Sequence, residues 1–145
     1  MSSNNPHIFY TDDDVDDREI FRDALAEADG AMILTTTGDG EALLNMLNEP
    51  PPVPRVIFLD LNMPGLNGFE ALRRIRSEDR LQDCPVVIFT TTDDEKAVRT
   101  TRSLGADLFV PKPQSFSGLK RVIAACVGRD WAQRADDSSY VMRIK

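Results

Sequence analysis

Several short apolar runs in this chain end in polar residues of the types that phosphoryl transfer requires. A carboxylate can bind a hard cation or attack phosphorus, and a hydroxyl or an ammonium can stabilise the charge of a phosphoryl group in transfer. The residues at the ends of these runs are Asp12, Asp13, Asp60, Thr90 and Lys112. Their types and positions predict an acidic site for phosphorylation.

These five residues should lie close together if the apolar runs are strands of one parallel sheet. Ligands of open parallel sheets bind beyond the carboxyl ends of the strands. Clustered carboxylates of Asp12, Asp13 and Asp60 would repel one another, so the site demands a compensating cation or raised pKa values. We expect Mg²⁺ as the cofactor, because this hard ion accepts one or two carboxylates and leaves positions for a phosphoryl oxygen. In this interpretation Asp60 is the nucleophile.

Strand-like runs alternate with helical periodicity along the chain, which predicts an α/β fold. The predicted strands are 7–11, 31–36, 56–59, 86–89 and 108–111. The predicted helices are 16–29, 41–48, one bearing Phe69, Leu72 and Ile75, 95–104 and 116–127. This alternation predicts a flavodoxin-like, doubly wound five-stranded parallel sheet with helices on both faces.

The chemistry favours the strand order 2-1-3-4-5. In that order the topological switch point lies between the first and third strands, where Asp12, Asp13 and Asp60 would meet. The order also places Pro111 on an edge strand, where a missing backbone N–H is tolerated.

Length and charge limit the classes of protein. The chain has 145 residues and a net charge of −7, which suits one domain and disfavours binding to nucleic acid or to an anionic membrane. Neither a signal peptide nor a transmembrane run is visible, and Cys84 and Cys126 lack metal-binding spacing, so we expect a cytoplasmic protein. The expected division is an N-terminal tail (1–6), one domain (7–129) and a C-terminal extension (130–145).

Four motifs together resemble the receiver domains of two-component response regulators, including the single-domain chemotaxis regulator. The motifs are Thr11-Asp12-Asp13-Asp14, the stretch from Phe58 through Asp60 and Asn62 to Glu70, Phe89-Thr90-Thr91, and Gly105-Ala106-Asp107 leading to Lys112-Pro113. The resemblance covers residues 8–128.

The resemblance implies a role for each matching residue. Asp12 and Asp13 would bind Mg²⁺, Asp60 would bind Mg²⁺ and accept the phosphoryl group, and the backbone carbonyl of Asn62 would complete the metal site. Thr90 and Lys112 would contact the phosphoryl group. Thr90 would also act with Phe109 as a conformational switch, although Phe109 lacks the hydroxyl of the more usual tyrosine.

The resemblance also implies partners. The phosphoryl group would come from a sensor histidine kinase or a histidine phosphotransfer protein. An unidentified downstream protein would then recognise the phosphorylated domain or receive the phosphoryl group in a relay. Residues 129–145 are too few for an output domain, so we expect a stand-alone signalling phosphoacceptor rather than an enzyme, with a homodimer left open.

Two alternatives remain open at this stage. Asp14, Asp16 and Asp17 are best interpreted as a solvated turn that caps a helix. The run Asp12-Asp13-Asp14-Val15 also fits the nucleophile motif of haloacid-dehalogenase-type phosphatases, with Asp12 as nucleophile. That mechanism needs a later acidic pair at a strand end, and the only candidate, Asp136-Asp137, follows no apolar run. It also leaves Asp60 unexplained.

The C-terminal extension contains a short segment with strand character. Tyr140, Met142 and Ile144 alternate with the period of a strand. We expect Trp131 to pack on the domain and residues 140–144 to pair with a sheet edge or with a second copy, because an exposed apolar strand requires a partner.

Overall fold

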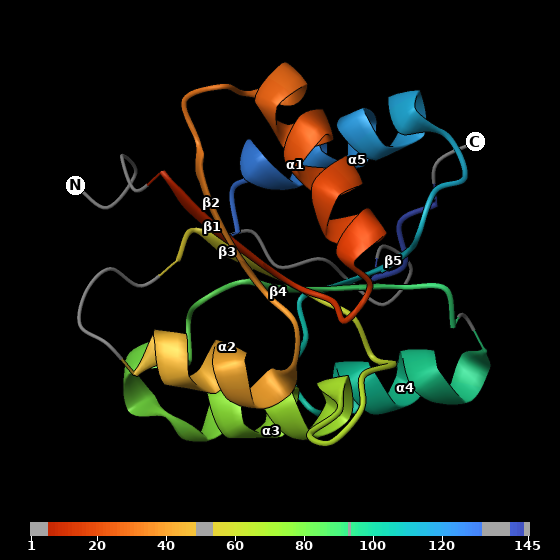
Figure 1. Cartoon of the computed structure of the whole chain (residues 1–145). Helices are drawn as coiled ribbons and strands as arrows, with labels where there is room; N and C mark the ends of the chain where they lie inside the picture. The colour runs from red at the N-terminus through yellow and green to blue at the C-terminus, as the bar shows by residue number, and fades with distance from the viewer. Residues whose placement is uncertain (1–5, 49–53, 93, 132–139, 144–145) are drawn as a thin grey trace.

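The protein folds around one five-stranded parallel sheet. The computed structural model describes residues 6–48, 54–92, 94–131 and 140–143. Its strands are β1 (His7–Thr11), β2 (Ile33–Thr37), β3 (Val56–Leu59), β4 (Val86–Thr90) and β5 (Leu108–Pro111). They pair in parallel in the order β2-β1-β3-β4-β5, which confirms the predicted fold class and strand order (Figure 1).

Helices cover both faces of the sheet. They are α1 (Val15–Ala28), α2 (Gly40–Leu47), α3 (Gly68–Ser77), the short 3₁₀ helix η2 (Asp79–Leu81), α4 (Glu95–Ser103) and α5 (Phe116–Val127). Helices α1 and α5 lie on one face, and α2, α3 and α4 lie on the other (Figure 1). Each α-helix begins after a side chain that accepts a backbone N–H of its first turn, which satisfies one of the otherwise unpaired donors. These caps are Asp14, Asp39, Asn67, Asp94 and Ser115.

The sheet separates two apolar cores because successive strand residues point to opposite faces. Ile8 and Tyr10 pack with Phe21 of α1 and with α5, whereas Phe9 packs with the helices on the other face. Buried on both sides, the central strands are apolar until their last residues, and their polar residues can gather only at the edge. In the described part of the chain, no helix is long and apolar enough to cross a bilayer.

The described part of the C-terminal extension packs on the domain. The indole Nε1–H of Trp131 donates to the carbonyl of Cys126 at 3.2 Å, which confirms the predicted contact of Trp131. Val141 forms a parallel bridge with Phe109 on the outer edge of β5, as predicted for a sheet edge. The strand period of Tyr140 and Met142 does not place them on one face here, because Tyr140 packs in the core beside α4 and Met142 packs against the opposite core. A single bridge is too short to impose the strand period, and Ile144 lies outside the described residues.

Removing the extension should destabilise the domain. Deleting residues 131–145 exposes apolar surface that Trp131 and Tyr140 cover, so we expect the melting temperature to fall by roughly 5 to 15 °C. Differential scanning calorimetry at several protein concentrations checks this. An unchanged melting temperature would mean that these contacts add nothing to stability.

Candidate functional site

The last hydrogen bonds of the sheet place the predicted site residues side by side. Three of these residues follow strands of the sheet, namely β1, β3 and β5, and the backbone N–H of each donates to the final carbonyl of an adjacent strand. The bonds run from Asp12 to Thr37 (3.1 Å), from Asp60 to Thr11 (3.1 Å) and from Lys112 to Thr90 (2.9 Å). The parallel ladder thus continues one residue beyond the strands, and it fixes the backbone from which each side chain projects.

The predicted carboxylates form one cluster at this edge. Asp12 is 1% exposed and Asp60 is 5% exposed, whereas Asp13 is exposed to solvent. One oxygen from each of the three carboxylates lies within 4.8 Å of the others. A set of oxygen donors this close, with no nitrogen or sulfur ligand in it, fits a hard divalent cation.

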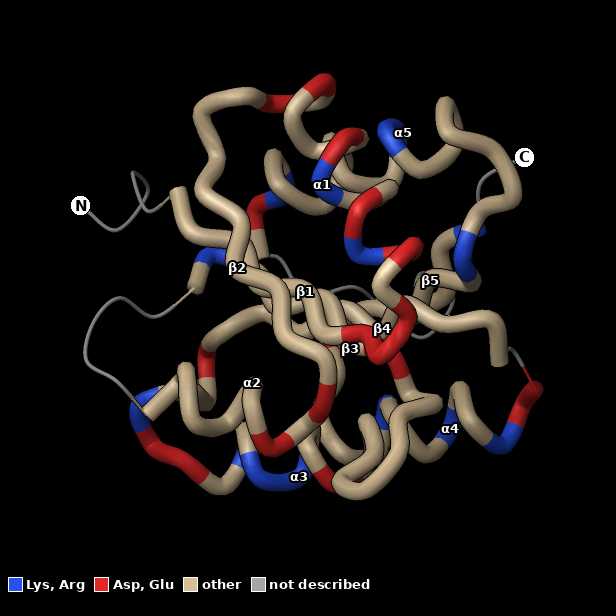
Figure 2. Tube along the Cα trace, viewed as in Figure 1, with Lys and Arg blue, Asp and Glu red and all other residues tan. Residues whose placement is uncertain are grey.

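The Lys112 ammonium joins these carboxylates at the centre of the site. Its Nζ donates to the carboxylates of Asp12 at 2.6 Å, Asp17 at 2.9 Å and Asp60 at 3.2 Å. Figure 2 shows acidic segments gathered at this end of the sheet, near the start of α1. One positive charge therefore offsets part of the repulsion among several negative charges.

Electrostatics at the site follow from burial and from this lysine. Burial raises the pKa of Asp60 above its ordinary value, although the Lys112 charge and the Asn62 N–H oppose the shift. Burial alone would lower the pKa of Lys112, but its hydrogen bonds to Asp12 and Asp17 outweigh this effect, and its pKa lies above the ordinary value. Lys112 is therefore positively charged throughout the physiological range.

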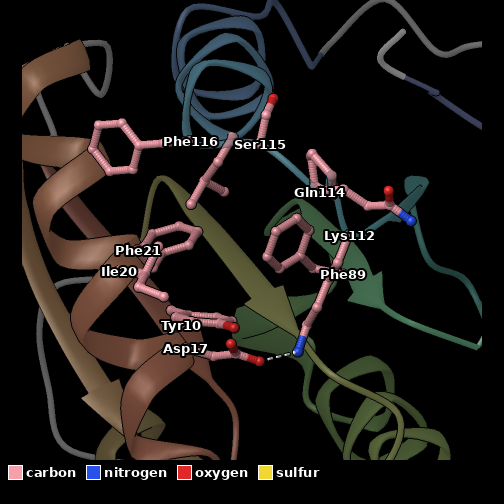
Figure 3. Close-up of a pocket in the computed structure, with 11 residues that line it drawn as sticks. Tyr10, Asp17, Ile20, Phe21, Phe89, Lys112, Gln114, Ser115 and Phe116 are labelled. Atoms are coloured by element: carbon pink, nitrogen blue, oxygen red, sulfur yellow. Dashed lines mark hydrogen bonds and ion pairs between the residues drawn. The ribbon is translucent and has the colours of Figure 1, made fainter.

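Two further residues belong to the site, and the sequence interpretation missed both. Asp17, interpreted as a solvated residue of the first helical turn, instead pairs with Lys112 (Figure 3). Tyr10 was interpreted only as a strand residue, yet its hydroxyl donates to Asp12 Oδ2 at 2.5 Å and its ring stacks on Phe21. A signal for Tyr10 existed, because residues 10 and 12 of a strand face the same side. The solvated interpretation holds for Asp14, which caps α1.

Tyr10, Asp17 and Lys112 also border a cavity of about 310 Å³ between the starts of α1 and α5. Its remaining wall is largely apolar and includes Phe89 and Phe116 (Figure 3). The rings of Tyr10 and Phe89 meet edge to face with centroids 5.8 Å apart. Aromatic packing on this side therefore holds the Tyr10 hydroxyl against Asp12.

Asn62 and two threonines border the other side of Asp60. The Asn62 backbone N–H donates to Asp60 Oδ1 at 3.2 Å, and its side-chain amide donates to Thr92 at 2.6 Å and to Thr90 at 3.4 Å. Thr90 is fully buried. The loop can turn back tightly here because Gly68, the first residue of α3, has no side chain. A β-carbon at that position would overlap the Asp60 carbonyl.

Phe109 lies apart from this cluster. It pairs with Ile88 of β4 and is fully buried in the core beside α4. Thr90 is the last residue of β4, and its partner in β5 is Pro111, so Phe109 precedes that pair by two residues on the adjacent strand. The two predicted switch residues are therefore separated by one strand spacing and by two residues along the strands, and they are connected through the β4–β5 ladder.

A family model for the response regulator receiver domain matches residues 8–124. The chain belongs to this family. The match decides between the two interpretations of the acidic run in favour of a receiver domain, because Asp60 and its loop belong to the matched pattern and the phosphatase alternative leaves them without a role. Asp136 and Asp137, which that alternative requires, lie outside the described residues.

Relatives and solved structures agree with this assignment. A probable chemotaxis protein CheY from Rhizobium etli is 29% identical over 121 residues, which cover 83% of this chain and 92% of that protein. The phosphorylated cyanobacterial phytochrome response regulator RcpA has a TM-score of 0.76 at 26% identity, with 83% of this chain and 90% of that chain covered. The Mn²⁺-bound response regulator Rcp1 has a TM-score of 0.73 at 26% identity, with the same coverage. This receiver chain spans between 45% and 57% of the length of several other curated relatives.

Replacing Asp60 with Asn should stabilise the receiver domain at neutral pH without divalent cations. Because burial raises the pKa of Asp60, its ionised form destabilises the folded state as the pH rises from the ordinary value of 3.8 through the raised value. At lower pH the carboxyl group is neutral, so the advantage of Asp60→Asn should disappear. We expect a gain on the order of 1 kcal/mol in the free energy of unfolding at pH 7. Urea denaturation at pH 7 and pH 4 checks this.

A variant less stable than the parent at pH 7 would contradict this account. It would mean that the attraction between Asp60 and Lys112 outweighs the cost of burying the carboxylate.

Proposed function

We propose that Asp60 is the phosphoacceptor of this receiver domain. The observation that carries the proposal is the 3.2 Å contact between the Lys112 ammonium and a nearly buried Asp60 carboxylate, beside Asp12 and Asp13. An ionised carboxylate can attack phosphorus as a nucleophile, and the Lys112 ammonium beside it can stabilise the negative charge of the transferred phosphoryl oxygens. RcpA, a relative of similar fold, has been solved in a phosphorylated form, which supports this role.

The phosphoryl donor in this proposal is a phosphohistidine of a sensor histidine kinase or a histidine phosphotransfer protein. An Asp60 oxygen forms a bond to phosphorus while the phosphorus–nitrogen bond breaks, and the electron pair stays on the imidazole nitrogen. Lys112 is positioned to stabilise the transferred oxygens if it gives up part of its contact with Asp17. Asp17 is 38% exposed at its side chain, so its carboxylate can be hydrated when the lysine moves.

The acidic cluster is proposed to hold Mg²⁺ through Asp12, Asp13, Asp60 and the backbone carbonyl of Asn62. Bound Mg²⁺ would neutralise charge on the phosphoryl oxygens. Tyr10 and Lys112 both donate to Asp12 Oδ2, so they fix the orientation of that carboxylate before a cation binds. The Mn²⁺-bound form of Rcp1 supports a divalent cation in a related protein.

Signalling is proposed to proceed through Thr90 and Phe109. Thr90 lies against the phosphoacceptor, and its movement toward a phosphoryl oxygen would let the buried Phe109 ring shift toward Thr90 and repack the surface of α4, β5 and α5. A downstream protein would read that surface, or a relay protein would take the phosphoryl group. The proposal places this domain, residues 7–129, in the cytoplasm, where the two buried free thiols suit a reducing environment.

Asp60→Asn should abolish phosphorylation. An amide oxygen is a far weaker nucleophile than a carboxylate, so labelling by acetyl phosphate with Mg²⁺ should fall by at least about 100-fold. Intact mass spectrometry of a label that resists acid and is lost in base measures this. Asp23→Asn, at an exposed position of α1, is the matched control and should label like the parent. Undiminished labelling of Asp60→Asn would refute the assignment.

Asp13→Asn should weaken Mg²⁺ binding by about tenfold or more, because it removes a charged ligand from the cluster. Isothermal titration calorimetry of the unphosphorylated protein measures the affinity directly. The control is Asp16→Asn, an exposed acidic residue in the same run that is not part of the carboxylate cluster. Equal affinity of the Asp13 variant, the Asp16 variant and the parent would remove Asp13 from the proposed metal site.

A further inference from the structure

The C-terminal segment is bound to the backbone of one residue, Phe109. The Phe109 N–H donates to the carbonyl of Tyr140 at 2.9 Å, and the Met142 N–H donates to the carbonyl of Phe109 at 2.9 Å. Both outward-facing backbone groups of Phe109 are thereby paired. The edge of β5 at this position is closed by a short parallel segment of the same chain (Figure 1).

The Tyr140 side chain occupies a built site between this edge and α4. Tyr140 is 3% exposed, and its hydroxyl lies 2.7 Å from the Oγ1 of the fully buried Thr101. The Thr101 hydroxyl has one hydrogen, which it donates to the Ala97 carbonyl at 2.9 Å or the Val98 carbonyl at 3.1 Å, so the Tyr140 hydroxyl is then the donor to Thr101. The Arg102 guanidinium lies over the ring, 5.2 Å from its centroid.

The same ring packs beside the proposed switch aromatic. The centroids of Tyr140 and Phe109 are 6.3 Å apart, and both rings belong to the core that includes Ala97 and Ala106. Phe109 has no hydroxyl, so packing alone holds its side chain. Protein cores tolerate few voids, and a shift of the buried Phe109 ring toward Thr90 would therefore open a gap beside Tyr140.

We propose that the outer edge of β5 and the adjoining side of α4 form a strand-binding surface, whose resting occupant is this chain's own segment 140–142, and that phosphorylation releases it. The inference rests on the proposed role of Asp60. Movement of Thr90 and Phe109 toward the phosphoryl group removes the ring contact that supports Tyr140. The segment then dissociates and exposes the N–H and carbonyl of Phe109 to an extended partner segment.

Coupling of this kind is reciprocal. If phosphorylation weakens binding of the segment, then the bound segment weakens binding of the phosphoryl substitute by the same factor, and a variant with a weakened segment should bind that substitute more tightly. The inference therefore predicts effects in both directions, and a segment that merely stabilises the fold would show neither.

The test uses amide hydrogen exchange by NMR on the full chain with Mg²⁺, with and without beryllium fluoride as the phosphoryl substitute. When beryllium fluoride binds, we expect hydrogen exchange of the Phe109 and Met142 amides to become about tenfold faster or more. The Ile33 amide, which is bonded to Pro6 at the opposite sheet edge, should keep its rate. The Asn62 amide reports binding independently, because it donates to Asp60.

Tyr140→Phe provides the reciprocal measurement, since it removes only the hydroxyl bonded to Thr101. Its affinity for beryllium fluoride should rise about three- to tenfold, as expected when a buried hydrogen bond of the resting state is lost. Ile33→Ala, at an exposed position of β2, is the control and should bind like the parent. Tyr140→Phe keeps the ring, so it should stay folded even if Tyr140→Ala does not.

Each outcome decides the inference. Binding at Asn62 with unchanged exchange at Phe109 and Met142, or unchanged affinity in Tyr140→Phe, would overturn it and leave the role of Asp60 intact. If the Asn62 amide showed that beryllium fluoride does not bind, the proposed function would be overturned, and this inference with it. Protection of Met142 that increases with protein concentration would show that the occupant comes from a second copy and would overturn the assignment to the same chain.

Discussion

The structure depends above all on one ammonium group that offsets the repulsion of a carboxylate cluster. Lys112 contacts Asp12, Asp17 and Asp60 with only 14% of its side chain exposed, so solvent screens these charges weakly. Without the Lys112 ammonium, the nearly buried carboxylates of Asp12 and Asp60 would face each other beside the exposed carboxylate of Asp13. Burial raises the pKa of Asp60 above its ordinary value, and the Lys112 charge opposes that shift. The three clustered carboxylates carry more negative charge than one ammonium offsets, so their oxygen atoms suit a divalent cation.

The fold brings these charges together by means of its topology and its apolar cores. The strand order β2-β1-β3-β4-β5 makes β1 and β3 neighbours, and hydrogen bonds that extend beyond the strand ends fix Asp12 and Asp60 side by side. Aromatic packing of Tyr10 against Phe21 supplies rigidity on one side. On the other, α3 can approach because Gly68 has no side chain. The apolar cores stabilise the domain, and this stability offsets the electrostatic repulsion of the carboxylates that the site brings together.

Sequence reasoning could predict the strands, their order and the residues at their ends, because strand period and helix period are distinct and parallel strands gather their carboxyl ends at one edge. It could not choose a role for Asp17, since an acid in the first turn of a helix is favourable whether or not it pairs with Lys112. That choice depends on the direction in which α1 leaves the sheet. It also could not assign the faces of Tyr140 and Met142, because their positions are set by Thr101 and by a single bridge to Phe109 rather than by a repeating ladder.

The most direct test of the account is to locate the covalent bond itself. Borohydride reduces an aspartyl phosphate to homoserine, and peptide mapping by mass spectrometry then identifies the modified position after treatment with acetyl phosphate and Mg²⁺. The account predicts homoserine at position 60 and at no other aspartate. Homoserine at position 12 would instead support the phosphatase-type nucleophile, and the absence of any reduced aspartate would contradict phosphorylation at this carboxylate cluster.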